Sequence, residues 1–139
     1  MRVDFYLIRD AKKSAEQLCC QLCAKAFSDE QQLAVLCNDQ QQSEQVDTML
    51  WQRPAQRFIP HGLATSEAAH KAMVVIGAVD EHTQMVVNLG HALPELPATH
   101  QVQRILDIVP NSEAARSAAR ERYRQYRQMG ADLHSHELG

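Results

Sequence analysis

Strand-like apolar runs alternate with helical apolar patterns in the first half of the chain. Residues 3–8, VDFYLI, and 33–37, LAVLC, are rich in β-forming side chains and predict two buried strands. Between them, residues 11–27 place apolar side chains at spacings of three and four, which predicts an amphipathic helix packed on a sheet. Asp39 stands at the N-cap position of a second helix, whose glutamine-rich side we expect to face solvent.

The second half continues with short apolar runs separated by polar connectors. Further strands are predicted at residues 57–63, 73–79, 85–90 and 102–109. Pro110 ends the last of these strands, and Asn111 or Ser112 is positioned to cap a final helix over residues 112–129. The boundaries are least well defined between residues 64 and 100.

Strands that alternate with helices predict an α/β fold: a single three-layer domain with a mostly parallel sheet flanked by helices. We expect this domain to span residues 1–131 and to be followed by a polar C-terminal tail, 132–139, in which His134 and His136 are frayed chain rather than metal ligands. The arrangement is Rossmann-like, but the turn after the first strand, LIRDAKKSAE, has neither a G-x-G-x-x-G nor a P-loop pattern. A nucleotide-binding loop is therefore not expected, and no hydrolase motif points to a catalytic residue.

The composition is that of a globular protein. Of 139 residues, 45% are hydrophobic and 22% are charged, with a formal net charge of −3. No apolar run approaches the ~20 residues of a membrane-spanning helix. The first residues, MRVDFYLIRD, do not resemble a signal peptide, so we expect a cytoplasmic protein without a membrane association.

Four cysteines fit a reducing compartment and lie at positions 19, 20, 23 and 37. The stretch CCQLC contains a C-x-x-C pair, but a structural zinc site normally needs a second pair of ligands, and the chain offers no matching motif. The spacing of three and four within a helical pattern favours core packing. We therefore predict neither a metal nor any other cofactor.

The final helix concentrates positive charge. Residues 112–130, SEAARSAARERYRQYRQMG, contain five arginines and two glutamates, a local charge of +3 in an acidic chain. At about 100° per residue, one helical sector of about 100° holds Arg116, Arg120, Tyr123, Arg124 and Arg127. Small side chains form the opposite flank, which is suited to close packing on a sheet.

Three interpretations of this arginine stripe are open. A solvated basic face is the simplest, although we expect such a face to mix charges of both signs, and this stripe is predicted to carry only like charges. Nucleic acid is a second possible ligand, but the net charge of −3 argues against it. Guanidinium groups around the ring of Tyr123 could instead hold a carboxylate beside an apolar side chain. Arg122 falls on the inner flank, with its stem expected to be buried and its head to reach solvent.

Several motifs resemble one known family. The segments LWQRPAQRFIPH (50–61), DIVP (107–110) and ARERYRQYR (119–127), with the opening DFYLI, are similar to the chi subunit of bacterial DNA polymerase III. The resemblance runs from about residue 3 to 131 and is weaker between 64 and 100. Three motifs in the right order make it specific.

The resemblance implies a non-catalytic accessory subunit of the clamp-loader assembly, which binds nucleic acid only indirectly. Chi proteins pair with the psi subunit and bind the acidic, phenylalanine-ending C-terminal tail of single-stranded-DNA-binding protein. The positions that match the family's tail-binding residues are Val109, Arg120, Tyr123, Arg124 and, less closely, Arg127. Arg124 stands where a family member has lysine, so the charge is kept but the geometry differs.

The first of these motifs, LWQRPAQRFIPH, carries aromatic residues on a connection between a helix and a strand. Trp51 is the only tryptophan of the chain, and Phe58 follows it beyond Pro54. Exposed aromatic residues on a connection are typical interface anchors, although Trp51 could also cover the end of the sheet. The resemblance implies that Trp51 and Phe58 serve psi binding, and the binding of a helicase-like protein at the same surface.

Overall fold

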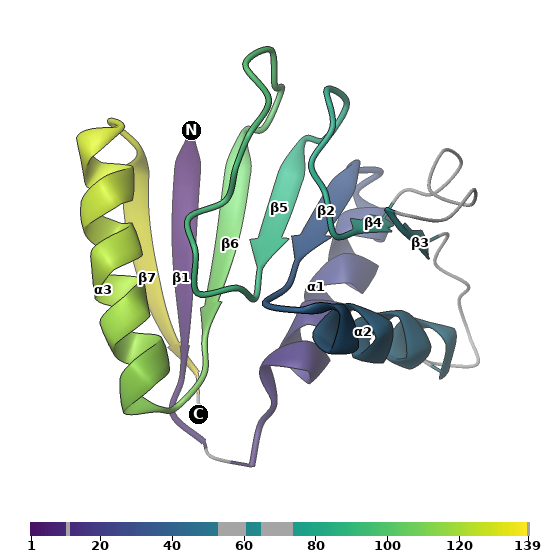
Figure 1. The fold of residues 1–139 in the computed structure, drawn as a ribbon, viewed down its shortest axis with the longest axis horizontal. Coiled ribbons are helices and arrows are strands. Elements are labelled where there is room, and N and C mark those ends of the chain that lie inside the picture. Colours follow the sequence, from purple (N-terminus) through teal and green to yellow (C-terminus); the bar gives the residue numbers. More distant parts are fainter. Residues whose placement is uncertain (11, 53–60, 65–73, 139) are drawn as a thin grey trace.

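The computed structural model of the protein describes residues 1–10, 12–52, 61–64 and 74–138 (Figure 1). Along the chain the elements are β1 (Arg2–Ile8), α1 (Ala15–Ser28), β2 (Leu33–Leu36), α2 (Gln40–Gln52), β3 (His61–Leu63), β4 (Val74–Ile76), β5 (Met85–Asn88), β6 (Arg104–Val109), α3 (Glu113–Gln128) and β7 (Asp132–Leu138). In this described part, seven strands form one parallel sheet in the order β3-β4-β2-β5-β6-β1-β7. The predicted α/β fold is confirmed.

Helices cover both faces of the sheet. Along β6, Leu106 and Ile108 pack in the core beneath α1 and α2, whereas Ile105 and Val109 belong to a second core beneath α3. This division follows from the period of two along a strand, which sends successive side chains to opposite faces. None of the helices in the described ranges is long and apolar enough to cross a membrane.

A polar side chain caps the N-terminus of each of the three described helices. Ser14 caps α1 in a capping box with Gln17, and the Asp39 side chain accepts a hydrogen bond from the backbone N–H of Gln42 at the start of α2. Of the two residues predicted to cap the final helix, Ser112 is the N-cap, and its Oγ accepts from the backbone N–H of Ala115. Each of these contacts satisfies a backbone donor that the first helical turn leaves unpaired.

The segment after α3 corrects one prediction. Residues 132–138, expected to belong to a polar terminal tail, form strand β7, which pairs in parallel with β1 along its whole length. Gly130, at φ +82°, allows the chain to turn sharply, and the N–H of Ala131 donates to the Tyr126 carbonyl while that of Gly130 donates to Arg127. This helix ending directs the chain straight back into the sheet.

A buried carboxylate joins β7 to the sheet. Asp4 is fully buried and accepts hydrogen bonds from Arg2, from Arg104 at 2.8 Å and from His136 Nε2 at 2.8 Å. Burial by itself raises the pKa of Asp4, but the hydrogen bonds from Arg2, His136 and Arg104 outweigh it and lower the pKa well below its usual value. His136, expected to lie on frayed chain, is therefore part of the folded sheet.

The cysteines of α1 lie in the core, as predicted. Cys19, Cys20 and Cys23 are all buried between this helix and the sheet. A hydrogen bond with Cys23 and burial raise the pKa of Cys19 well above its usual value. This thiol therefore stays protonated at neutral pH and packs as a small apolar side chain.

Candidate functional site

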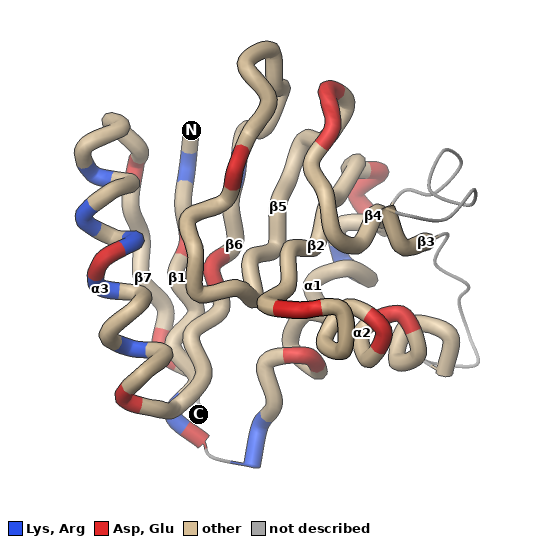
Figure 2. The backbone as a smooth tube through the Cα atoms, viewed as in Figure 1, with Lys and Arg blue, Asp and Glu red and all other residues tan. Residues whose placement is uncertain are grey.

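Helix α3 has two distinct faces. Its buried face consists of Ala115, Ala119, Arg122 and Tyr126, which pack against the sheet as the helical pattern predicted. Arg120 and Arg124 belong to the exposed face, and Figure 2 marks the arginines of α3 as separate blue bands along the helix. The small alanines bring the helix close to the sheet, and the longer side chains beside them border a groove.

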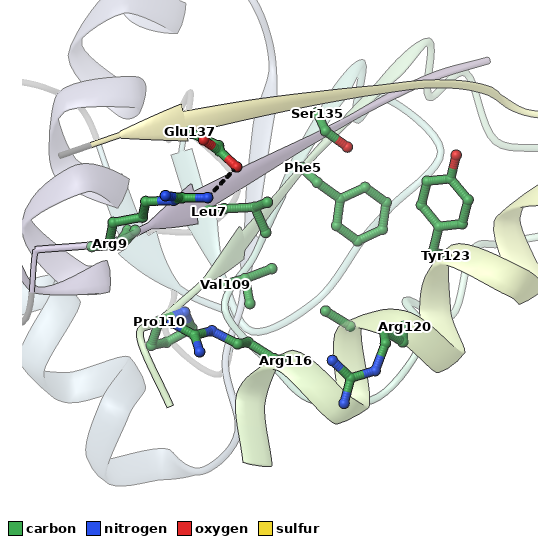
Figure 3. Close-up of a pocket in the computed structure, with 12 residues that line it drawn as sticks. Phe5, Leu7, Arg9, Val109, Pro110, Arg116, Arg120, Tyr123, Ser135 and Glu137 are labelled. Carbon is green, nitrogen blue, oxygen red and sulfur yellow. Dashed lines mark hydrogen bonds and ion pairs between the residues drawn. The ribbon is translucent and has the colours of Figure 1, made fainter. Parts of the chain in front are cut away.

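This groove lies between α3 and the ends of three neighbouring strands, β1, β6 and β7 (Figure 3). Its volume is about 710 Å³. Its apolar lining comprises Phe5, Leu7, Ile8, Val109, Pro110 and Ala119. Its polar lining comprises Arg9, Arg116, Arg120, Tyr123, Ser135 and Glu137. We refer to these twelve residues as the α3 groove, an apolar trough with a mostly cationic rim.

The α3 groove brings together three of the five residues predicted to bind a peptide tail. Val109 forms part of its floor and is almost fully buried, while Arg120 and Tyr123 stand on the helix side. The Tyr123 ring lies 5.6 Å from the ring of Phe5, centroid to centroid, and 41% of Tyr123 is exposed. Arg124 and Arg127 belong to the same helix but do not line the groove.

Three arginines of the stripe on α3 have partners, which corrects the prediction of a stripe with only like charges. Arg120 Nη2 lies 2.9 Å from Glu113 Oε1, and Arg124 pairs with Glu121 at 3.4 Å. Arg116 donates a hydrogen bond to the side-chain oxygen of Asn111. Exposed ion pairs of this kind contribute only about 0–1 kcal/mol, so an incoming carboxylate can replace them at little cost.

Arg122 also differs from its prediction, because its head does not reach solvent. The side chain is 3% exposed, and it donates from Nε and Nη2 to the two carboxylate oxygens of Asp107, at 2.9 and 2.7 Å. Its Nη1 donates to the backbone carbonyl of His91. The Arg122 and Asp107 charges are buried together, and three hydrogen bonds satisfy the guanidinium.

The Asp107 carboxylate is the centre of a wider buried network. It also accepts from the hydroxyl of Tyr126 at 3.1 Å and from the side-chain amide of Asn88 at 3.3 Å. Burial and the neighbouring negative charge raise the pKa of Tyr126 far above its usual value, so the hydroxyl remains a donor. These contacts fix α3 on β6 and thereby hold the helix wall of the groove in place.

Arg116 belongs to the arginine stripe predicted from the sequence, but the groove residues of β1 and β7 were not predicted as part of a site. Phe5 and Leu7 lie on the face of β1 that α3 covers, because every second residue of a strand lies on the same face of the sheet. Ser135 and Glu137 enter the groove only because β7 pairs beside β1. No local pattern predicts that pairing, so these two positions could not be found without the fold.

A second surface lies at the other end of the sheet. Trp51, near the end of α2, is 60% exposed, and its ring centroid lies 4.9 Å from that of His61 on β3. The His61 ring in turn lies 3.3 Å from the Asp47 carboxylate. Phe58 lies outside the described residues. The strands β3 and β7 form opposite edges of the sheet, so Trp51 and the α3 groove are far apart.

Comparisons with known proteins find one family. Residues 1–134 match the family model described as DNA polymerase III chi subunit, HolC. The DNA polymerase III subunit chi of Pseudomonas aeruginosa is 35% identical, and the match covers 99% of this chain and 96% of the relative. The subunit chi of Escherichia coli is 28% identical over 94% of each chain, and that of Haemophilus influenzae is 26% identical over 97% and 96%.

Proposed function

The chain belongs to the chi-subunit family of DNA polymerase III, and on this premise we propose that it acts as a non-catalytic adaptor in DNA replication. One side, the α3 groove, binds the acidic, phenylalanine-ending C-terminal tail of single-stranded-DNA-binding protein. The other side, around Trp51, pairs with the psi subunit of the clamp loader. The observation that carries the proposal is the groove itself, which combines an apolar trough with a cationic rim.

The chemistry of the groove suits this tail. A volume of about 710 Å³ exceeds what one aromatic side chain needs, so a terminal phenylalanine and the residue before it both fit. Phe5 and Tyr123 offer ring faces and edges to that phenylalanine. Arg116 and Arg120 on the same wall provide planar donors for carboxylates, including the one at the chain end.

Direct binding to nucleic acid is the alternative, and the charges of the described surface disfavour it. Glu113 and Glu121 interrupt the arginine stripe and pair with its members. A protein that tracks a phosphate backbone needs an extended positive surface, whereas this chain has a net charge of −3. The cations here are instead gathered around an apolar trough, an arrangement typical of peptide recognition.

Trp51 supports the proposed psi surface. A tryptophan with 60% of its surface exposed leaves a large apolar area in water, and such residues are frequent anchors in protein interfaces. Its contact with His61 holds the ring at the end of the sheet without covering it. We also expect Phe58 to contribute to this surface, and a helicase-like partner to use it.

Titration of a fluorescein-labelled peptide ending in Asp-Asp-Asp-Ile-Pro-Phe tests the proposal by fluorescence anisotropy. Arg120→Ala should weaken binding by about 1.5 kcal/mol, the low end of the range for hydrogen bonds to charged groups, because its side chain is 64% exposed. Removal of the terminal phenylalanine from the peptide should weaken binding by at least as much.

Arg127→Ala is the matched control, since it removes the same charge from the same helix outside the groove. We expect it to change the binding free energy by less than about 0.5 kcal/mol, through long-range charge alone. Equal effects of Arg120→Ala and Arg127→Ala would show that the peptide responds to the net charge of α3 and does not occupy the groove. Single-stranded DNA that binds more tightly than the peptide would favour the alternative.

A further inference from the structure

One exposed ion pair lies inside the α3 groove, where the end of β1 meets β7. Arg9, directly after β1, and Glu137, near the end of β7, face each other with Nη2 and Oε1 2.6 Å apart (Figure 3). Their side chains are 67% and 56% exposed, so the pair is surrounded by solvent. Among the described residues that line the groove, Glu137 is the only acidic one.

The position of Arg9 is fixed by its backbone and not by this pair. Its N–H donates to the carbonyl of Leu138 at 2.8 Å, and its own carbonyl accepts from the side-chain amide of Asn111 at 2.9 Å. The same Asn111 accepts a hydrogen bond from Arg116 on the opposite wall. Asn111 thus links the backbone of Arg9 to the guanidinium of Arg116. The guanidinium of Arg9 can therefore turn to another acceptor while its backbone stays in place.

We propose that Arg9 is a specificity-determining residue that binds the acidic part of the tail. In the free protein, the Glu137 carboxylate takes the place of the ligand carboxylate on Arg9 and so competes with the peptide. This inference rests on the proposed function of the α3 groove. The terminal phenylalanine and its carboxylate lie against the Tyr123 and Arg120 side. An aspartate further from the end of the peptide displaces Glu137 and takes its place on Arg9.

Displacement of Glu137 from Arg9 should cost little binding free energy. The exposed Arg9–Glu137 pair is weak, because solvent and salt screen it, and its loss is compensated by the new pair with the peptide. Glu137, once displaced, still repels the acidic peptide from within the groove. Glu137→Gln removes both effects, and we expect it to tighten peptide binding about twofold to fivefold at low salt.

A double-mutant cycle separates competition at Arg9 from a general change of charge. The peptide ending in Asp-Asp-Asp-Ile-Pro-Phe is titrated into the wild type, Arg9→Gln, Glu137→Gln and the double variant. Arg9→Gln should weaken binding about twofold to fivefold. The gain from Glu137→Gln should be smaller when Arg9 is absent, because only the repulsion of the peptide by Glu137 then remains to be removed. In the wild type, the Nε–H resonance of Arg9 should also shift when the peptide is added.

Two outcomes overturn the inference. If Glu137→Gln gives the same gain with and without Arg9, the effect is one of net charge and Glu137 does not compete for that cation. If Arg9→Gln leaves the affinity unchanged and the Arg9 Nε–H resonance of the wild type does not move, Arg9 does not contact the peptide. In both cases the proposed function stands as long as Arg120→Ala weakens binding, whereas a peptide that fails to bind the wild type overturns both proposals together.

Discussion

The buried pair of Asp107 and Arg122 fixes the helix wall of the α3 groove, and its loss should remove much of the protein's stability. Arg122→Met keeps a long side chain but removes both hydrogen bonds to the Asp107 carboxylate, which has no exposed surface. Breaking a buried ion pair by removing one partner costs about 3–5 kcal/mol. A domain is stable by only about 5–15 kcal/mol, so the free energy of unfolding should fall by a large fraction.

Urea unfolding at pH 7, followed by far-UV circular dichroism, measures this loss. Arg124→Met is the matched control, because the Arg124 side chain is 70% exposed and its pair with Glu121 is a surface contact; we expect a change within about 0.5 kcal/mol. Asp107→Asn, added to Arg122→Met, should recover part of the loss because it removes the uncompensated buried charge.

A small effect of Arg122→Met would contradict this role of the buried pair. A loss below about 1 kcal/mol, similar to that of an average substitution, would mean that Tyr126 and Asn88 alone satisfy the Asp107 carboxylate. It would also mean that α3 keeps its place without the pair. Peptide binding by the same variant, measured where it is still folded, reports whether the groove has kept its shape.

Two further predictions concern the opposite sides of the molecule. The pKa of Asp4 is lower in the folded state than in the unfolded state, so the unfolded state binds more protons in acid. The stability that Asp4 contributes is complete above its unfolded pKa of about 3.9. It is lost as the pH falls from there through the folded pKa. Urea midpoints between pH 6 and 3 should therefore fall less steeply in Asp4→Asn than in the wild type, and parallel curves would contradict this. Trp51→Ala should abolish co-purification with the psi subunit and change peptide affinity by less than about 0.5 kcal/mol, while Arg120→Ala should do the reverse. Loss of both partners with a lower melting temperature would assign Trp51 a structural role.

The sequence predicted the parts of the fold that depend on local patterns. The strand at β6, its end before Pro110 and the cap at Ser112 are set by neighbouring residues, and the structure confirms them. The inner face of α3 was predicted for the same reason, since the positions of Ala115 and Ala119 follow from the helical period alone.

Two of the wrong predictions concern residues whose partners are distant in the chain. Strand β7 is polar, with histidines at alternate positions, and is ordered by pairing with β1 more than a hundred residues earlier. The head of Arg122 was expected to reach solvent, because Asp107 faces it only after α3 folds back over β6. In the α3 groove, the helix side was therefore predicted, whereas the contributions of β7, Ser135 and Glu137, were not.

Nuclear magnetic resonance mapping shows directly whether the acidic tail binds in the α3 groove. Unlabelled peptide ending in Asp-Asp-Asp-Ile-Pro-Phe is added to the ¹⁵N-labelled protein, and the amide shifts are followed. We predict the largest shifts at Leu7, Val109, Tyr123 and Ser135, which surround the groove, and no shift of the Trp51 indole N–H at the other end of the sheet. Shifts centred on Trp51, with the four groove amides unmoved, would show that the peptide binds at the opposite end of the sheet.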